Sequence, residues 1–314
     1  MKDIAQLLPN MREVLIPIDK SDASERTIKF AACLLAPLSE GVVEKIILLH
    51  VLGVSFIEKM AANIDTRVAE LIKSPLFKRL AEEYISKEIR PLLDEAEKIL
   101  QQAGVKCVIS KEIIEGDPTK EISNFANKHD IRTIIMGRRR RSAIKERVLG
   151  SCSYAVTHRP GRHTDYIVGQ EEIDLEHCPV PKILVPFDGS DYAGNALREA
   201  SGLARAFPEG VVKIAVLYVV ESAYLGKLSE KEQEVLKKAR EILLENGVPP
   251  EIVETELRYG DPAEEIVKAA EEGHFNIIMM GRTGKSGLKE LILGSVSSRV
   301  LHLAERPTVA LVSA

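Results

Sequence analysis

The sequence contains no tryptophan, and its other aromatic residues are few. It has only four cysteines, which never form a CxxC pair, so a small disulfide-built scaffold is disfavoured. This sparse usage is typical of a protein from a reducing compartment. We therefore expect free thiols, mostly buried, at Cys33, Cys107, Cys152 and Cys178.

Membrane and export signals are also missing. No apolar run has the length of a membrane span, and the N-terminal stretch MKDIAQLLPNMREV lacks the basic segment and apolar core of a secretory signal. The net charge of -4 gives no general attraction to nucleic acid or to an anionic membrane. Even the basic stretch GRRRRSAIKER (137–147) has no aromatic residues on which bases could stack. We expect a cytoplasmic protein with no membrane partner and no specific nucleic-acid partner.

Signatures of catalysis are absent as well. There is no GxSxG turn and no HExxH helix, and no serine or cysteine stands beside a recognisable histidine base. His158, His163, His177 and Cys178 are near one another in sequence, but their spacings match no standard zinc pattern. We expect neither a dedicated catalytic site nor a zinc site.

What the chain does contain is a long internal repeat. EVLIPIDKSDASERTIKFAACLL (13–35) aligns with KILVPFDGSDYAGNALREASGLA (182–204), and MGRRRRSAIKERVLGSCS (136–153) aligns with MGRTGKSGLKELILGSVS (280–297). A repeat of this length is a duplicated domain, because solenoid units are only about 20–50 residues long. The predicted division is a first domain at 1–170, a polar linker at 171–180 and a second domain at 181–314.

Within each copy, short runs of β-branched residues alternate with longer helical patterns. The runs have the length of strands buried on both faces, which is typical of a parallel sheet. In Asp261-Pro262-Ala263-Glu264, an N-cap, a first-turn proline and a glutamate three residues after the cap predict a helix start. The pattern predicts the α/β class, with two tandem doubly wound α/β domains and helices on both faces of each sheet.

The two copies differ by one long segment. The first copy has an extra helical segment at about 53–103, which is rich in strong helix formers. Its simplest interpretation is a longer crossover helix with an added helical hairpin, and a lid or a partner-docking arm is the alternative.

A glycine pattern in the second copy is the chain's best candidate for a binding site. GRTGKS contains the GKS of a phosphate-binding P-loop, but Met279 stands where that motif requires its first glycine. What remains is Gly281 and Gly284 after a buried strand, then nine residues, then Gly294 and Ser295 at a helix start. Glycines let a ligand approach the main chain, and the unpaired amides of a helix start favour an anion. Taken alone, however, glycines at strand and helix ends are mostly turn residues.

Four stretches of the second half together resemble the universal stress protein family: ILVPFDGS (183–190), VLYVV (216–220), YGDPAEEI (259–266) and IMMGRTGKSGLKELILGSVSSRVLHLAERPTVALV (278–312). The family's G-2x-G-9x-G-[S/T] signature is complete there. The first half resembles the same family from Val14 to Val168 with weaker motifs, so the chain is similar to a tandem member. The resemblance implies a five-stranded parallel sheet of order 3-2-1-4-5 in each half. It also implies that the last strands of the two halves pair, forming an intramolecular pseudo-dimer, and it leaves a further homodimer open.

The resemblance further implies a nucleotide site in the second domain. Such a protein would bind ATP or another adenine nucleotide in a stress response, with at most slow incidental hydrolysis, and Mg²⁺ could bridge the phosphates. The adenine and ribose pocket would be lined by Pro186, Phe187, Asp188 and Val219. The residues that would follow the triphosphate are Met280, Gly281, Arg282, Gly284, Gly294, Ser295, Val296 and Ser297.

The first copy departs from this pattern at two glycines. Lys20 replaces Gly189, and Arg140 replaces Gly284. A non-glycine residue forced to left-handed φ costs about 1–2 kcal/mol, and the arginine side chain would enter the phosphate space. We therefore predict that the first domain does not bind ATP in the family manner.

Three alternatives remain open at this level. The protein could be a scaffold or chaperone-like interaction module that binds no nucleotide. It could be an enzyme that transfers phosphate or adenylate, or its arginine run could capture a polyanion by bidentate pairing.

Overall fold

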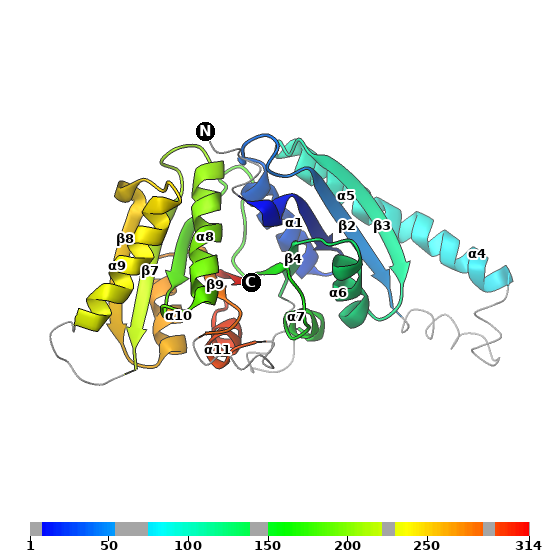
Figure 1. The fold of residues 1–314 in the computed structure, drawn as a ribbon. Helices are drawn as coiled ribbons and strands as arrows, with labels where there is room; N and C mark the ends of the chain where they lie inside the picture. The colour runs from blue at the N-terminus through cyan, green and yellow to red at the C-terminus, as the bar shows by residue number, and fades with distance from the viewer. Residues whose placement is uncertain (1–7, 54–74, 139–149, 222–229, 285–292, 314) are drawn as a thin grey trace.

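The computed structural model describes residues 8–53, 75–138, 150–221, 230–284 and 293–313 (Figure 1). The first half contains β1 (Glu13–Pro17), α1 (Asp22–Leu35), β2 (Lys45–Leu52), α4 (Pro75–Tyr84), η3 (Ile85–Ile89), α5 (Arg90–Gln102), β3 (Val108–Glu115), α6 (Pro118–Lys128), β4 (Thr133–Gly137), α7 (Ser151–Thr157) and β5 (Thr164–Val168). The second half contains β6 (Lys182–Pro186), α8 (Asp191–Ala206), β7 (Lys213–Val220), α9 (Glu230–Glu245), β8 (Val253–Tyr259), α10 (Pro262–Glu272), β9 (Ile277–Gly281), α11 (Ser295–Leu303) and β10 (Thr308–Val312). Short 3-10 turns precede β1 and β8, at Pro9–Met11 and Pro250–Ile252.

All ten strands form one sheet in the order β3-β2-β1-β4-β5-β10-β9-β6-β7-β8. Each half is parallel and has the predicted order 3-2-1-4-5. The last strands of the halves, β5 and β10, pair antiparallel, with Val309 opposite Ile167. This pairing confirms the predicted pseudo-dimer and covers two strand edges that would otherwise be open to association.

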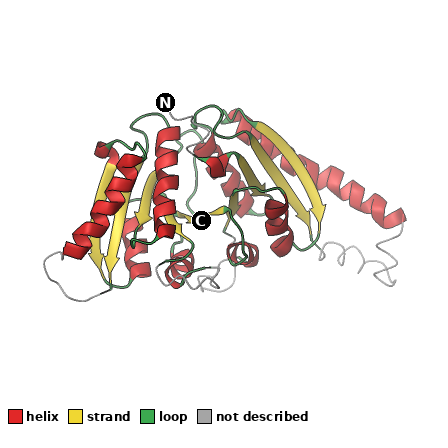
Figure 2. Cartoon of the chain, viewed as in Figure 1, coloured by secondary structure: helices red, strands yellow, loops and turns green. Residues whose placement is uncertain are grey.

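Side chains alternate between the two faces of the sheet, and helices pack on both (Figure 2). In β1, Ile16 belongs to the core beneath α1, α5, α8 and α9, whereas Leu15 belongs to the core beneath α6, α7, α10 and α11. Each core contains residues of both halves. The doubly wound α/β prediction is therefore confirmed for both domains.

Side-chain caps fix where several helices begin. Asp261 accepts hydrogen bonds from the backbone N–H groups of Ala263 and Glu264, both at 3.1 Å, and Pro262 is the first residue of α10. Ser190 caps α8 in the same way through the N–H of Ala193. These caps hold the helix starts at the carboxyl ends of the strands, where the candidate site lies.

The predicted extra segment is helical in its described part, and residues 54–74 lie outside the described residues. A π-helical turn, η3, joins α4 to α5, and α4 extends beyond the sheet at the right of Figure 1. The buried residues of α5 are Leu93, Ala96 and Leu100, which pack into the core beside α1. In this way α5 acts as the crossover helix between β2 and β3.

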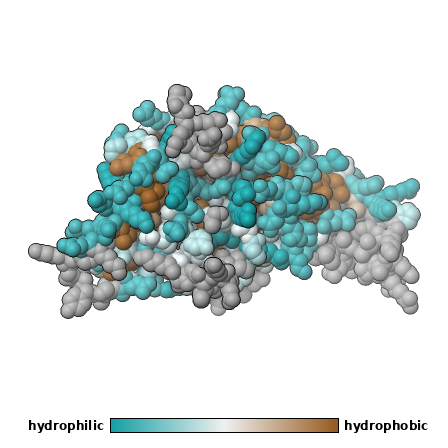
Figure 3. Space-filling view, in the orientation of Figure 1, coloured by the Kyte–Doolittle hydropathy of each residue, from teal (hydrophilic) through white to brown (hydrophobic). Residues whose placement is uncertain are grey.

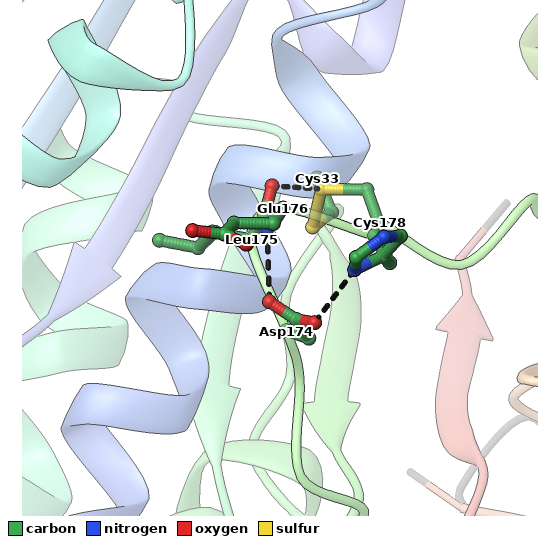
Figure 4. Close-up of a disulfide and its surroundings, with 6 residues drawn as sticks. Cys33, Asp174, Leu175, Glu176 and Cys178 are labelled. Atoms are coloured by element: carbon green, nitrogen blue, oxygen red, sulfur yellow. Dashed lines mark hydrogen bonds and ion pairs between the residues drawn. A yellow bond between two sulfur atoms is a disulfide. The ribbon is translucent and has the colours of Figure 1, made fainter.

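The expectation of four free thiols is wrong for two of them. Cys33 near the end of α1 and Cys178 in the linker form a disulfide, with their Cα atoms 5.3 Å apart (Figure 4). Neither Cys107 nor Cys152 is part of a disulfide, and both are half-buried. The stretch between β5 and β6 passes beside α1, and the sequence separation of 145 residues gave no signal of that proximity.

The surface in the view of Figure 3 is mostly hydrophilic, with separate apolar patches. Among the described residues, no helix combines the length and the apolar character that crossing a bilayer requires.

Candidate functional site

A pocket opens at the carboxyl ends of β6, β7 and β9, beside the start of α11. Its volume is about 570 Å³, which is within the usual range for small-molecule sites. In doubly wound sheets, ligands bind at such carboxyl ends, where the strand order reverses. Here the strand order reverses at β6, because β7 and β8 lie on one side of it and β9 and β10 lie on the other.

Eleven of the twelve predicted site residues line this pocket. They are Pro186, Phe187, Asp188, Val219, Met280, Gly281, Gly284, Gly294, Ser295, Val296 and Ser297. These residues come from three separate strand ends and one helix start, so the fold brings together motifs that are up to about a hundred residues apart in sequence.

Arg282 is the exception. Its side chain is 5% exposed and turns toward the first domain, where Nη1 donates to the carbonyl oxygen of Thr157 at 3.0 Å. Nη2 donates to Asp165 Oδ2, forming a buried ion pair. The residue follows the pocket glycine Gly281 in sequence, yet its guanidinium takes part in domain contacts rather than in the pocket.

Several lining residues were missed by the motif reasoning. They are Ala193, Leu217, Tyr218, Val220, Glu221, Pro262, Ile266 and Thr283. Pro262 and Ile266 belong to the repeated GDP stretch, whose duplication was a usable signal. Burial raises the pKa of Tyr218, and the carboxylates of Glu232 and Asp188 add to that rise.

Gly281 is required for space, because a Cβ there would meet backbone, whereas a Cβ at Gly284 would meet only the end of the Asp188 side chain. A Cβ at Gly284 would lie 2.9 Å from Asp188 Oδ2, and one at Gly281 would lie 2.7 Å from the carbonyl carbon of Tyr192 in α8. Neither glycine has a positive φ, so the expected left-handed strain at the Gly284 position is wrong. Positive φ occurs instead at Gly189, with φ of 87°.

The start of α11 is suited to an anion. Its N-cap, Gly294, has no side chain to satisfy the first amides, unlike Ser190 and Asp261 at the starts of α8 and α10. Ser295 is exposed at the pocket, but Ser297 is buried and its Oγ donates to the carbonyl oxygen of Gly281 at 2.9 Å. The described lining residues include no lysine or arginine, and the amides of this helix start are a source of positive potential among them.

The first domain has a corresponding pocket of about 550 Å³. It is lined by Asp19, Val51, Gly137 and Gly150 to Ser153, among others. Lys20 turns outward, with Nζ 2.5 Å from Glu88 Oε2 and 5.1 Å from the centre of the Tyr84 ring. The other substitution in this domain, Arg140, lies outside the described residues, so the prediction of no ATP binding there stays a prediction.

The turn after β1 differs from its counterpart after β6. Asp19 Oδ1 accepts a hydrogen bond from the N–H of Ser21 at 2.9 Å, just as Asp188 Oδ1 does from that of Ser190. Asp19 Oδ1 also accepts one from Ser24 Oγ at 2.8 Å, and Ala193 at the corresponding position has no hydroxyl. Among the described non-glycine residues, only Asp130 and His274 have positive φ, so Lys20 avoids the conformation that Gly189 adopts. A different turn thus holds the same aspartate at the same strand end.

The architecture defines a tandem pair of doubly wound α/β domains, each with a ligand-sized pocket at its strand ends. The chain belongs to the universal stress protein family: the model of the "Universal stress protein family" matches at residues 10–160 and again at 179–311.

Relatives with known names agree with this assignment. Universal stress protein MJ0531 of Methanocaldococcus jannaschii is 37% identical over 141 residues, which are 41% of this chain and 79% of that protein. The crystal structure of a universal stress protein from Archaeoglobus fulgidus has a TM-score of 0.68 at 22% identity and covers 98% of both chains, showing that the whole two-domain fold is shared. A universal stress protein solved in complex with cAMP matches 42% of this chain and 95% of its own, with 21% identity and a TM-score of 0.33.

Proposed function

We propose that the second domain binds an adenine nucleotide, with ATP as the ligand that the family resemblance implies, and that this binding serves a cytoplasmic stress response. The observation that carries the proposal is the convergence of eleven predicted residues on one pocket of about 570 Å³. Their convergence is not a consequence of sequence proximity, since β6 and α11 begin more than a hundred residues apart.

The lining suits the parts of such a ligand. Phe187, Val219 and Ile266 provide apolar surface for a base, and Asp188 provides a carboxylate for ribose or amine donors. The amides that open α11 lie where phosphates would lie in this arrangement. Mg²⁺ bridging the phosphate oxygens would supply compensating charge.

We propose binding rather than turnover. The described lining residues include no histidine, the side chain that most often serves as a general base. Phosphate release from ATP with Mg²⁺ at rates far above the uncatalysed background would replace this proposal with an enzymatic one.

A thermal-melting experiment tests the binding. Denaturing the purified protein and identifying any released nucleotide shows what it retains, and melting with ATP and Mg²⁺ measures the stabilisation. A ligand at about 100 times its Kd adds about 2.7 kcal/mol, which corresponds to several degrees.

Gly284→Arg should abolish that stabilisation, because even its Cβ would lie 2.9 Å from Asp188 Oδ2. Gly194→Ala is the control, since its Cβ would be 3.6 Å from the nearest atom, the end of the Arg198 side chain. No response to ATP in the native protein would favour the scaffold alternative, and an undiminished response in Gly284→Arg would refute the assigned pocket.

A further inference from the structure

Two buried arginines cross between the domains in reciprocal fashion. Arg138 follows Gly137 at the end of β4, and its Nη2 donates to the carbonyl oxygen of Leu301 in α11 at 2.5 Å. Arg282 follows Gly281 at the end of β9, and its Nη1 donates to the carbonyl oxygen of Thr157 in α7 at 3.0 Å. Each arginine therefore binds the last turn of the other domain's helix.

The same two helices touch the pockets at their opposite ends. Ser151, Cys152 and Ser153 begin α7 and line the first-domain pocket. The residues that begin α11, from Ser295 to Ser297, line the second-domain pocket. Each helix thus extends from a pocket in its own domain to an arginine of the other domain.

Two serines complete the connection. Ser153 Oγ donates to the carbonyl oxygen of Gly137, and Ser297 Oγ donates to that of Gly281, both at 2.9 Å. Each serine ties the start of its helix to the strand-end glycine that precedes a crossing arginine. The contacts therefore form a closed ring that passes through α7, Arg282, α11 and Arg138 and touches both pockets.

The side chains that form the ring are buried. Arg138 is 2% exposed and Arg282 is 5% exposed, and Ser153 and Ser297 are also buried. Close-packed protein interiors transmit displacements rather than deform smoothly. A cation at the end of α11 and an anion at its start also both interact favourably with the helix dipole.

The two crossings are not equivalent. Arg282 is paired with Asp165, whose Oδ1 also lies 2.7 Å from His163 Nδ1. The residue of the second domain at the position of Asp165 is Val309, which offers Arg138 no charge. Burial lowers the pKa of Arg138 to about 10, and the charge of Glu305 opposes this shift. The Arg138 crossing is the one that holds the helix of the proposed nucleotide pocket.

We propose that the two pockets are coupled through this ring, with Arg138 and Arg282 as positioning residues, so that a nucleotide in the second-domain pocket changes the first-domain pocket. The coupling rests on the proposed function, because it needs ATP to occupy the second pocket.

Cys152 is a reporter for the first-domain pocket. Its thiol is not part of a disulfide and is half-buried in the pocket lining, and its rate of alkylation by iodoacetamide can be measured with and without ATP and Mg²⁺ in the full chain. ATP should slow the alkylation by about fivefold, near the low end of ordinary allosteric coupling. Cys107, the other cysteine outside the disulfide, is half-buried beside β3 and away from both pockets, so its rate should stay constant.

Substitutions in the ring should remove the effect of ATP on Cys152 while ATP still binds. Arg138→Met and the milder Ser153→Ala should both bring the rate ratio close to one, and Arg138→Lys should retain part of the effect. Ser153→Ala keeps the test usable if Arg138→Met does not fold. Arg306→Met, which removes an exposed arginine paired with Glu171, should behave like the native protein.

The outcomes separate the two proposals. Absence of ATP binding, measured independently by melting, refutes the proposed function. ATP binding with an unchanged Cys152 rate overturns the coupling, and so does slowing that persists in Arg138→Met and Ser153→Ala. Slowing that persists in Gly284→Arg also overturns it, because ATP would then be entering the first pocket directly.

Discussion

The two domains have the same strand order and pockets of nearly equal volume, yet they differ in the turn beside each pocket. In the second domain Gly189 takes a positive φ, whereas in the first domain Lys20 avoids that conformation and binds Glu88 instead. Both copies retain a glycine at the strand end that a helix approaches closely. A Cβ would clash with the facing helix at Gly137 as well as at Gly281.

The comparison teaches that the copies diverged at particular positions rather than throughout the site. Gly137 and Gly281 are the same, whereas Lys20 stands opposite Gly189 beside the pocket and Asp165 stands opposite Val309 at the domain contact. Substitutions that exchange features between the copies therefore test which differences matter.

The largest expected effect on the free energy of unfolding is that of Asp165→Val, which introduces the residue type of the counterpart, Val309. In Asp165→Val, Arg282 loses its buried carboxylate, and removal of one partner of a buried pair costs about 3–5 kcal/mol. Urea unfolding of the native and variant proteins measures the loss. Glu171→Ala, which breaks an exposed pair with Arg306, should cost less than about 1 kcal/mol. Similar losses in both variants would show that the carbonyl oxygen of Thr157 suffices to hold Arg282.

The next effect concerns the disulfide, which has no equivalent in the second domain. Gly202 of α8 stands at the position of Cys33. Replacing both Cys33 and Cys178 by serine should cost about 2–4 kcal/mol, because the bond closes a long loop of the unfolded chain. Dithiothreitol should lower the stability of the native protein by a similar amount and leave the double variant unchanged. A native protein indifferent to dithiothreitol would contradict the assignment.

A smaller effect should follow from exchanging the turn residues. Gly189→Lys places a side chain at a φ of 87° and should cost about 1–2 kcal/mol. Lys20→Gly removes only an exposed ion pair with Glu88 and a contact with the Tyr84 ring, so it should cost less than about 1 kcal/mol. Equal costs in denaturant titrations would mean that the two turns are less different than their backbones indicate.

Much of the fold was predictable because its signals are local. Buried strand runs, the Asp261 cap and the repeated glycines each specify a short piece of backbone, and their order in the chain leaves few ways to connect them. The same locality explains why eleven of the predicted site residues line one pocket. Each of them sits at a strand end or helix start that the repeat already marked.

Two of the missed features depend on how distant parts of the chain face one another. The direction of the Arg282 side chain and the Cys33–Cys178 bond both require the relative position of the two halves, which no local pattern encodes. The reason for Gly284 was also misjudged, since a glycine that lies close to the end of the Asp188 side chain and one needed for positive φ look the same in sequence.

The smallest expected effect is a pH dependence that only one domain should show. Glu199 of α8 is fully buried and accepts hydrogen bonds from Thr164 Oγ1 at 2.8 Å, Tyr166 OH at 2.9 Å and Asn10 Nδ2 at 3.1 Å. Its counterpart in α1 is Phe30, which packs against Tyr166 and cannot titrate. Burial raises the pKa of Glu199 despite these three bonds.

A carboxyl group whose folded pKa is raised contributes stability that is fully present below its ordinary value of 4.5 and is lost as the pH rises through the folded value. The free energy of unfolding of the native protein should therefore fall relative to Glu199→Gln above pH 4.5, with a slope of at most about 1.4 kcal/mol per pH unit. Urea titrations of both proteins at several pH values measure the difference, and Glu171→Gln serves as an exposed control. A relative slope of opposite sign would show that the hydrogen bonds from Thr164, Tyr166 and Asn10 outweigh burial, so that this contact between the domains holds an ionised carboxylate.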